Sequence, residues 1–416
     1  MELLTHERAF RSRADKTASG YRIALPSSRW GTQYVGTVTY LSGTPGAGPR
    51  TELDTASSEP LHPAAREVLL AALDQGYADP RRLHHPGRSA RLLLDNARAV
   101  VAETLGVRTD EVSFTGSGTE AVHRGLLGLL RGSRRGRQVA HSPVEHAAVR
   151  HAVAWGGEPV EVPCDRAGRV HADDLTRAAL APEVGVVALQ TANHEVGTVQ
   201  PVGEVEPPDG VPLFTDACAS MGRLPLPGGW AAAAGSAHKW GGPAGVGVLL
   251  VRKGARWRNP FPGDDRVDER VAGFENVPGA LAAAAALQAV VAEREDVSAR
   301  QRLLVDRIRA AVAEIPDTEV VGDPVDRLPH LVTCSFLYVD GEALVHALDR
   351  HGFGVASGSA CAASTLEPSA VLAAMGVLTH GNVRVSLGRD TTEAEVHRFL
   401  AVLPGVVRDL RAEVGL

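Results

Sequence analysis

Apolar positions follow two different periods along the chain. They recur at helical spacing over residues 63–73 and 89–105, and Gly106 follows the second segment where the capping glycine of a helix belongs. Apolar runs of strand length then alternate with helical segments. These runs cover residues 112–116, 185–192, 211–217 and 246–254. The alternation predicts an α/β protein with a mostly parallel sheet and helices on both faces.

Apolar and polar positions follow a different order in the C-terminal third of the chain. Residues 275–315 have a helical pattern, and shorter strands and helices follow in turn. Strands are predicted at 330–338, 353–357 and 382–388. Helices are predicted at 342–350, between the strands 353–357 and 382–388, and at 392–403. This order predicts a second, smaller α+β unit. The first fifty residues have no clean period and end in a Gly/Pro cluster at 42–50, so they form an unassigned extension.

Composition narrows the class of protein. The chain has 416 residues, with 44% hydrophobic and 22% charged positions, which is typical of a folded protein of two or three units. These values exclude disordered, collagen-like and coiled-coil classes. The formal net charge of −6 lacks the basic excess of a nucleic-acid-binding surface. We therefore expect no direct binding of nucleic acid.

The spacing of the cysteines and the residues at the start of the chain indicate the cellular compartment of the protein. The four cysteines form no C-x-x-C pair, so we expect a reducing environment and no zinc site. Acidic residues interrupt the first sixteen positions, where a signal peptide needs an apolar run. The longest apolar stretch, residues 277–291, is too short to span a bilayer. These features predict a cytoplasmic protein without membrane contact.

Lys239 is the first candidate for chemistry. It lies between a predicted strand end and a glycine-rich turn in SAHKWGGPAGVG, directly after Ser236 and His238. A lysine in such a place can be desolvated, which lowers the pKa of its amine and favours Schiff-base formation. On the lysine alone, a surface residue before a hairpin remains the open alternative.

Two further segments carry candidate binding groups. The segment 115–120 (TGSGTE) follows a strand and opens a helix, so the N–H groups of Gly118 and Thr119 would form a phosphate seat. Asp216 ends a buried strand, where a carboxylate is costly unless it meets a cation such as a protonated pyridine nitrogen. Taken alone, a capped turn and a helix cap remain open for these two segments.

Cys361 differs from the other three cysteines in its surroundings. It lies in SGSACAASTLEP, a run of small residues without an apolar period, which predicts an exposed loop and a reactive thiol. Cys164, Cys218 and Cys334 lie in or beside apolar strands, so we expect them to be inert.

In this order, the phosphate seat, the carboxylate, the lysine and the cysteine resemble those of the pyridoxal-phosphate-dependent cysteine desulfurases. These enzymes belong to the class V aminotransferase group of fold type I. The resemblance extends from about Leu53 to the C-terminus and is most specific over residues 357–376 and 382–392. The loop around Cys361 resembles the longer version found in iron–sulfur assembly and nitrogenase maturation.

The resemblance implies an architecture as well. It implies a homodimer and a large domain with a mainly parallel seven-stranded sheet beside a smaller α+β domain. We assign the N-terminal part of the small domain to 51–65, the large cofactor-binding domain to 66–300, and the C-terminal small domain with the cysteine loop to 301–416. Residues 1–50 stay unassigned.

The resemblance also assigns roles to residues. Lys239 would hold pyridoxal 5′-phosphate (PLP) covalently, Asp216 would pair with its pyridine nitrogen, and His146 would stack on its ring and move protons. The phosphate would be bound by Gly118, Thr119, Ser236 and His238. Arg384 would bind the substrate carboxylate, since a guanidinium fork suits that group. Asn193 and His194 belong to the segment that lines cofactor and substrate.

This sequence departs from the family at several of these positions. His194 replaces the second asparagine of an Asn-Asn-Glu motif, and Ala219 replaces a glutamine that bonds the cofactor's phenolic oxygen. Phe274 and Val271 replace a threonine and an arginine near the neighbouring subunit's phosphate. We hypothesise that His194 supplies the hydrogen bond that Ala219 cannot make.

The implied activity is that of a cysteine desulfurase, a sulfurtransferase. Sulfur would leave L-cysteine as a persulfide on Cys361, L-alanine would be released, and the sulfur would pass to an acceptor protein. The acceptor could serve iron–sulfur clusters, DNA phosphorothioation, thionucleosides or a natural product. Two alternatives stay open. One is another class V enzyme that does not need Cys361, such as a cysteine lyase, a selenocysteine lyase or an aminotransferase-like enzyme. The other is a weakly active sulfur-transfer scaffold.

Overall fold

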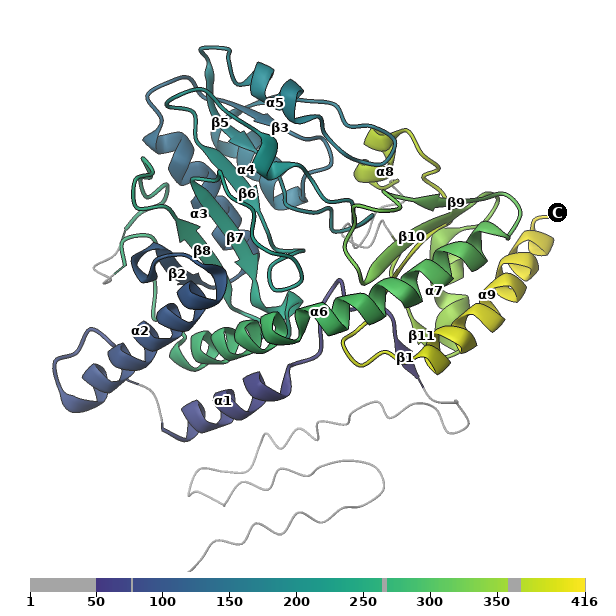
Figure 1. Ribbon diagram of the computed structural model, residues 1–416, viewed down its shortest axis with the longest axis horizontal. Helices are drawn as coiled ribbons and strands as arrows, with labels where there is room; N and C mark the ends of the chain where they lie inside the picture. The colour runs from purple at the N-terminus through teal and green to yellow at the C-terminus, as the bar shows by residue number, and fades with distance from the viewer. Residues whose placement is uncertain (1–49, 76–77, 264–267, 358–367, 416) are drawn as a thin grey trace, which may run out of the picture. The chain divides into compact units, whose positions relative to one another are not determined.

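A seven-stranded sheet forms the centre of the fold in the computed structural model, which describes residues 50–75, 78–263, 268–357 and 368–415. In spatial order its strands are β2 (Val112–Thr115), β8 (Gly247–Val251), β7 (Ala232–Ser236), β6 (Leu213–Asp216), β5 (Val184–Ala188), β3 (Gln138–His141) and β4 (Glu158–Glu161) (Figure 1). Neighbouring strands from β7 to β4 are parallel, whereas β8 runs antiparallel to β7 and β2. The predicted mainly parallel sheet is therefore confirmed.

Helices cover both faces of this sheet. One face packs against α3 (Gly118–Gly132) and α4 (Ala147–Gly156), and the other against α2 (His85–Leu105) and α6 (Val277–Ala313). α1 (Pro63–Asp74) packs on α6, and α5 (Ala172–Ala178) adds to the core beside β3 and β5. At Gly125, an added Cβ would lie 2.6 Å from the Phe214 ring, so α3 lies directly on β6. Short 3-10 turns η1 (Thr109–Glu111), η2 (Val202–Glu204) and η3 (Ala237–Lys239) complete this region.

A second hydrophobic core lies within the predicted C-terminal unit. It contains an antiparallel sheet of β9 (Thr318–Val321), β10 (Leu331–Phe336) and β12 (Asn382–Ser386), with helices α7 (Gly341–Arg350) and α9 (Glu393–Glu413). The short helix α8 (Ala370–Met375) packs instead with Val144, Val196 and Val321. β1 (Thr51–Glu52) pairs in parallel with β11 (Phe353–Gly354). The start of the described chain therefore joins the C-terminal part of the fold (Figure 1).

The long helix α6 contributes to both cores. Ala282 to Leu287 pack against the central sheet, whereas Leu304 to Val312 pack with β10 and α9. The domain boundary predicted at residues 300 and 301 falls inside this helix. The domain boundaries at 65 and 300 stay predictions.

The sequence pattern missed several short elements, namely β3, β4, β7, β9, α4 and α5. β7 is AAAGS and gives no branched apolar signal, although every residue in it is buried. α9 was predicted only to 403, but it continues past Pro404 because Val406 and Val407 extend its buried face. Within the described ranges, no helix is both long and apolar enough to cross a membrane.

Candidate active site

A cavity of about 220 Å³ lies where β6 and β7 end and α3 begins. This is the edge at which parallel sheets place their ligands. Its walls are formed by Ser117, Gly118, Thr119, Val122, His146, Ala148, Gln190, Ala192, His194, Asp216, Cys218, Ala219, Ser236, His238 and Lys239. The structure thus brings together eight of the residues predicted to bind the cofactor: Gly118, Thr119, His146, His194, Asp216, Ser236, His238 and Lys239.

The first turn of α3 forms one wall. Ser117 caps the helix by accepting the Glu120 N–H at 3.0 Å, while the carboxylate of Glu120 is bound by Arg124 at 2.6 Å. N–H groups in a first helical turn have no partner within the helix. At Gly118 an added Cβ would lie 2.6 Å from Ser236 Cβ. Glycine thus allows the helix start to approach the end of β7.

Hydrogen bonds from neighbouring segments hold the turn that carries Lys239 in place. Ser236 Oγ and His238 Nδ1 lie 3.1 Å apart. The carbonyl of His238 accepts the Glu59 N–H at 2.8 Å, and the carbonyl of Lys239 accepts a hydrogen bond from Arg223 at 3.3 Å. Burial lowers the pKa of His238, which favours its neutral form. These contacts fix the backbone on both sides of the predicted Schiff-base lysine.

Asp216 lies at the end of β6 and is 6% exposed. One of its carboxylate oxygens accepts the Cys218 N–H at 2.9 Å. Burial and the neighbouring Asp216 charge raise the pKa of the Cys218 thiol well above its usual value. The raised pKa keeps the Cys218 thiol protonated, although this residue lines the cavity.

His146 and His194 meet edge to face in the cavity, with ring centroids 4.8 Å apart and planes inclined at 72°. His146 caps α4, and its Nδ1 accepts the Ala148 N–H at 3.1 Å, which places the ring proton on Nε2. Burial lowers the pKa of His146 and lowers that of His194 well below its usual value. Both rings are therefore neutral near pH 7.

Two predicted residues lie just behind this wall. Asn193 Oδ1 accepts the N–H groups of Glu195 and Val196 at 2.8 and 2.9 Å, and its Nδ2 donates to the Val144 carbonyl at 3.0 Å. Arg384 donates to the His194 carbonyl at 3.0 Å. Neither residue is among those that line the cavity, so their proposed contacts with cofactor or substrate stay predictions.

Cys361 lies outside the described residues. The chain on each side of that gap is attached to the site. Ala356 exchanges backbone hydrogen bonds with Arg384, and Ser369 donates to the buried carboxylate of Glu195 at 2.6 Å. Burial raises the pKa of Glu195. Residues near both ends of the predicted cysteine loop are thus bound to the layer behind His194.

Glu145 and Gln190 lie at the site but were not predicted from the sequence. Glu145 accepts the Gln190 N–H at 2.7 Å, and burial raises the pKa of this carboxyl to about 8. Gln190 Nε2 also donates to the Val144 carbonyl at 2.7 Å. The position of Glu145 directly before His146 was the available signal, but the pattern did not show that it is buried.

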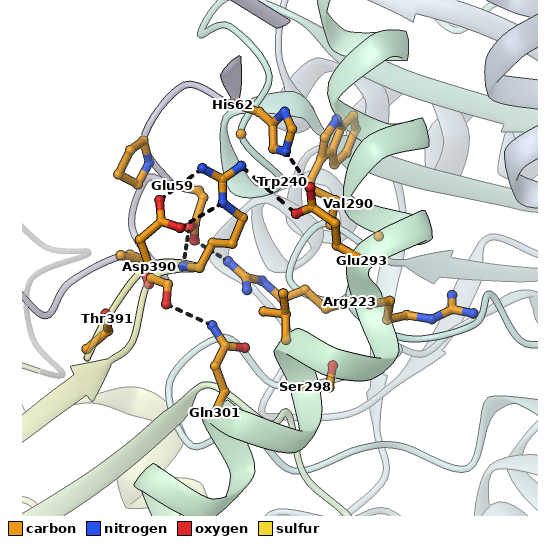
Figure 2. A pocket seen from close by; sticks show the side chains of 18 of the residues that line it. Glu59, His62, Arg223, Trp240, Val290, Glu293, Ser298, Gln301, Asp390 and Thr391 are labelled. Atoms are coloured by element: carbon orange, nitrogen blue, oxygen red, sulfur yellow. Dashed lines mark hydrogen bonds and ion pairs between the residues drawn. The ribbon is translucent and has the colours of Figure 1, made fainter. Parts of the chain in front are cut away.

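A larger cavity of about 450 Å³ is lined by Trp240 and Gly241, which directly follow Lys239 in the chain, together with the residues labelled in Figure 2. Charged side chains from the segment after β1, from α6 and from the loop before α9 line it. Glu59 and Arg223 form a buried ion pair at 2.6 Å, and His62 approaches Glu293 at 3.4 Å. These groups brace the turn from behind, and none of the residues predicted to bind the cofactor lines this cavity.

Comparisons with known proteins identify the family of this chain. Residues 52–399 match the family described as aminotransferase class-V. Since this match covers most of the chain, the protein belongs to the class V aminotransferase family. A cysteine desulfurase of Cereibacter sphaeroides is 38% identical over 384 residues, which cover 87% of this chain and 97% of that protein. An IscS-like cysteine desulfurase of Mycobacterium tuberculosis is 37% identical, covering 86% and 96%.

A solved NifS-like protein shares the fold with a TM-score of 0.79 and 27% identity, covering 87% of this chain and all of the other. Within the class V family, the chain therefore belongs to the cysteine desulfurases. The predicted family and fold type are confirmed.

Proposed function

We propose that this chain uses PLP to remove sulfur from L-cysteine, giving L-alanine and a persulfide on Cys361. The observation that carries the proposal is the set of groups around one cavity. This cavity is lined by a lysine, a buried carboxylate, a neutral histidine and the start of a helix that opens with glycine. These groups belong to Lys239, Asp216, His146 and Gly118. Every one of these groups suits a step of PLP chemistry.

The cavity walls fit the cofactor. The first turn of α3, with Ser236 and His238 beside it, offers N–H and O–H donors at a positive helix end, as a phosphate requires. Asp216 offers a buried negative charge for a protonated pyridine nitrogen. An added Cβ at Gly118 would lie 2.6 Å from Ser236 Cβ, so it would occupy the space between the first turn of α3 and the end of β7.

When bound, PLP supplies an electron sink for the carbanion at the substrate Cα. Lys239 would hold the cofactor through Nζ and, once released, would accept and return protons as a general base. His146 keeps its proton on Nε2, on a ring that lines the cavity. The guanidinium of Arg384 would bind the substrate carboxylate.

Sulfur transfer would depend on Cys361. Its thiolate would attack the sulfur of L-cysteine, so that an S–S bond forms while the substrate C–S bond breaks. The remaining carbon fragment takes up a proton and leaves as alanine, and the terminal sulfur then passes to an acceptor protein. Burial raises the pKa of Cys334 to about 12, so this thiol does not compete as a nucleophile.

We propose a homodimer as well. Large apolar side chains stand exposed on α1, on α2 and in the segment before α6. They include Leu70 at 47%, Leu92 at 71% and Phe274 at 56% exposure. Ala72, Leu93 and Phe274 from these three segments line one surface cavity, and exposed apolar side chains around such a hollow favour an interface between subunits. Sedimentation velocity of the purified protein tests this: a monomer at micromolar concentration would contradict it.

The lysine tests the proposed chemistry. Lys239→Ala is expected to purify without covalently bound cofactor and to make no alanine from L-cysteine. Lys253→Ala is the control, because this exposed lysine forms only a surface ion pair with Asp110. It is expected to behave as the parent. Alanine production by Lys239→Ala at the parental rate would contradict the proposal.

A further inference from the structure

A small chamber of about 10 Å³ lies behind the predicted cofactor site. It is lined by Ala56, His194, Ala219, Arg223, Lys239, Leu328, His330 and Leu331. Three of these residues, His194, Ala219 and Lys239, also line the cofactor cavity. The chamber therefore adjoins the site at its lysine.

Two imidazole nitrogens at this chamber have no hydrogen-bond partner in the described part of the chain. His330 precedes β10 and is 1% exposed, and its carbonyl accepts the Leu387 N–H at 2.8 Å, which fixes its backbone. Its Nδ1 is buried and has no hydrogen-bond partner among the described residues. The same holds for Nδ1 of His194, which is 7% exposed. A buried polar atom without a partner is unfavourable, so native proteins satisfy such atoms, often with water.

The size and polarity of the chamber suit one water molecule. One buried water needs about 10–15 Å³ of probe-sized space and two to four polar partners. The chamber offers that space because Ala219 contributes only a methyl group. It also offers two imidazoles and Lys239, while Leu328 and Leu331 close its apolar side.

We propose that this chamber binds one water molecule, which hydrogen-bonds to Nδ1 of both His194 and His330. His330 is then a positioning residue that acts through the water on His194 and on the neighbouring Lys239. The inference rests on the proposed function only for its kinetic test.

The protonation states suit this bridge. Burial lowers the pKa of both histidines well below the usual value, and the nearby cations Arg223, Arg384 and Lys239 lower that of His330 further. A neutral imidazole has one donor and one acceptor nitrogen, and a water molecule can serve either. The bridge would fix the orientation of His194, whose ring edge meets His146 in the cavity.

A high-resolution crystal structure tests the water directly. We expect one water within about 2.7–3.2 Å of both Nδ1 atoms. An empty chamber, or Nδ1 atoms bonded to protein groups instead, would overturn the proposal. This readout does not depend on activity, so it stands apart from any failure of the proposed function.

Substitution tests the positioning role. His330→Leu is expected to lower kcat for alanine formation about tenfold with little change in KM, and His330→Gln to recover most of the loss. His141→Leu is the matched control, because His141 is also 1% exposed with an unpartnered ring nitrogen but lines neither cavity. Equal losses in His330→Leu and His141→Leu, or no rescue by glutamine, would reduce His330 to a packing residue and overturn the role.

Discussion

Arg384 is bound to Asp54, with Nη2 2.7 Å from the carboxylate Oδ1. The same nitrogen donates to Ser57 Oγ at 2.6 Å, and Nη1 donates to the His194 carbonyl at 3.0 Å. The arginine is 6% exposed. The segment that follows β1 therefore holds in place the guanidinium predicted to bind the substrate carboxylate, and it joins that guanidinium to the lining segment of the site.

Asp54→Asn is expected to raise KM for L-cysteine about tenfold and to change kcat less, because the guanidinium loses the charge that orients it. The free energy of unfolding should fall by about 2 kcal/mol, less than for a fully buried pair, since the Asp54 side chain is 26% exposed. Steady-state kinetics and urea unfolding measure the two effects. Ser57→Ala is the control and should cost about 1 kcal/mol or less. An unchanged KM in Asp54→Asn would contradict the positioning role.

Gly118→Ala is expected to weaken cofactor binding more than tenfold. The new methyl group would lie 2.6 Å from Ser236 Cβ and 2.8 Å from its Oγ, so the helix start must move away from β7. Overpacking of this kind costs about 1–3 kcal/mol. Titration of the apoprotein with PLP measures the loss. Gly228→Ala is the control, since its Cβ would meet no atom within 4 Å. Equal PLP affinity in both variants would refute the close-approach argument.

His194→Ala is expected to change the absorption spectrum of the bound cofactor and to lower turnover about tenfold, because His194 lines the cavity beside Ala219, which has no hydrogen-bonding group. His194→Asn should keep part of the activity, since an amide can still donate. Spectra and alanine formation are measured on the same samples. A spectrum and turnover identical to the parent in His194→Ala would show that this histidine does not make the missing bond.

Glu145→Gln is expected to alter the pH dependence of stability. Burial raises the pKa of Glu145 to about 8 in the folded protein, above its unfolded value. The folded state therefore keeps a proton that the unfolded state releases, and stability falls as the pH rises from the unfolded pKa toward about 8. The effect amounts to a few kcal/mol.

Thermal unfolding of parent and Glu145→Gln across that range measures it. The glutamine variant should lose less stability with rising pH than the parent. Parallel pH profiles for the two proteins would show that the carboxyl ionises normally in the fold.

Much of the fold could be predicted because its signals are local. The branched apolar runs at β5, β6 and β8 and the helical period of α2 identify these elements without knowledge of their neighbours. β7 could not be predicted in this way. Its alanines are buried by α3 and by the adjacent strands rather than by their own bulk, and that packing is a property of the whole sheet.

The candidate site shows the same division. Lys239, Asp216 and Gly118 were predictable because each stands at the end of a recognisable strand or the start of a helix. Glu145 and His330 were not, since their importance comes from burial against segments distant in sequence. Glu145 contacts Gln190, and His330 reaches the site only through the chamber behind Lys239.

In the proposed reaction, Cys361 takes sulfur from L-cysteine bound in the cavity that Lys239 lines. Purified parent and Cys361→Ser protein, with Cys334→Ser as a buried-thiol control, are incubated with L-cysteine and a thiol reductant, and alanine and sulfide are measured together. We expect equal amounts of both products from the parent and from Cys334→Ser. We expect neither product from Cys361→Ser, although that variant keeps its cofactor absorbance. Parental activity in Cys361→Ser would contradict the proposed sulfur transfer and favour a lyase that does not need this cysteine.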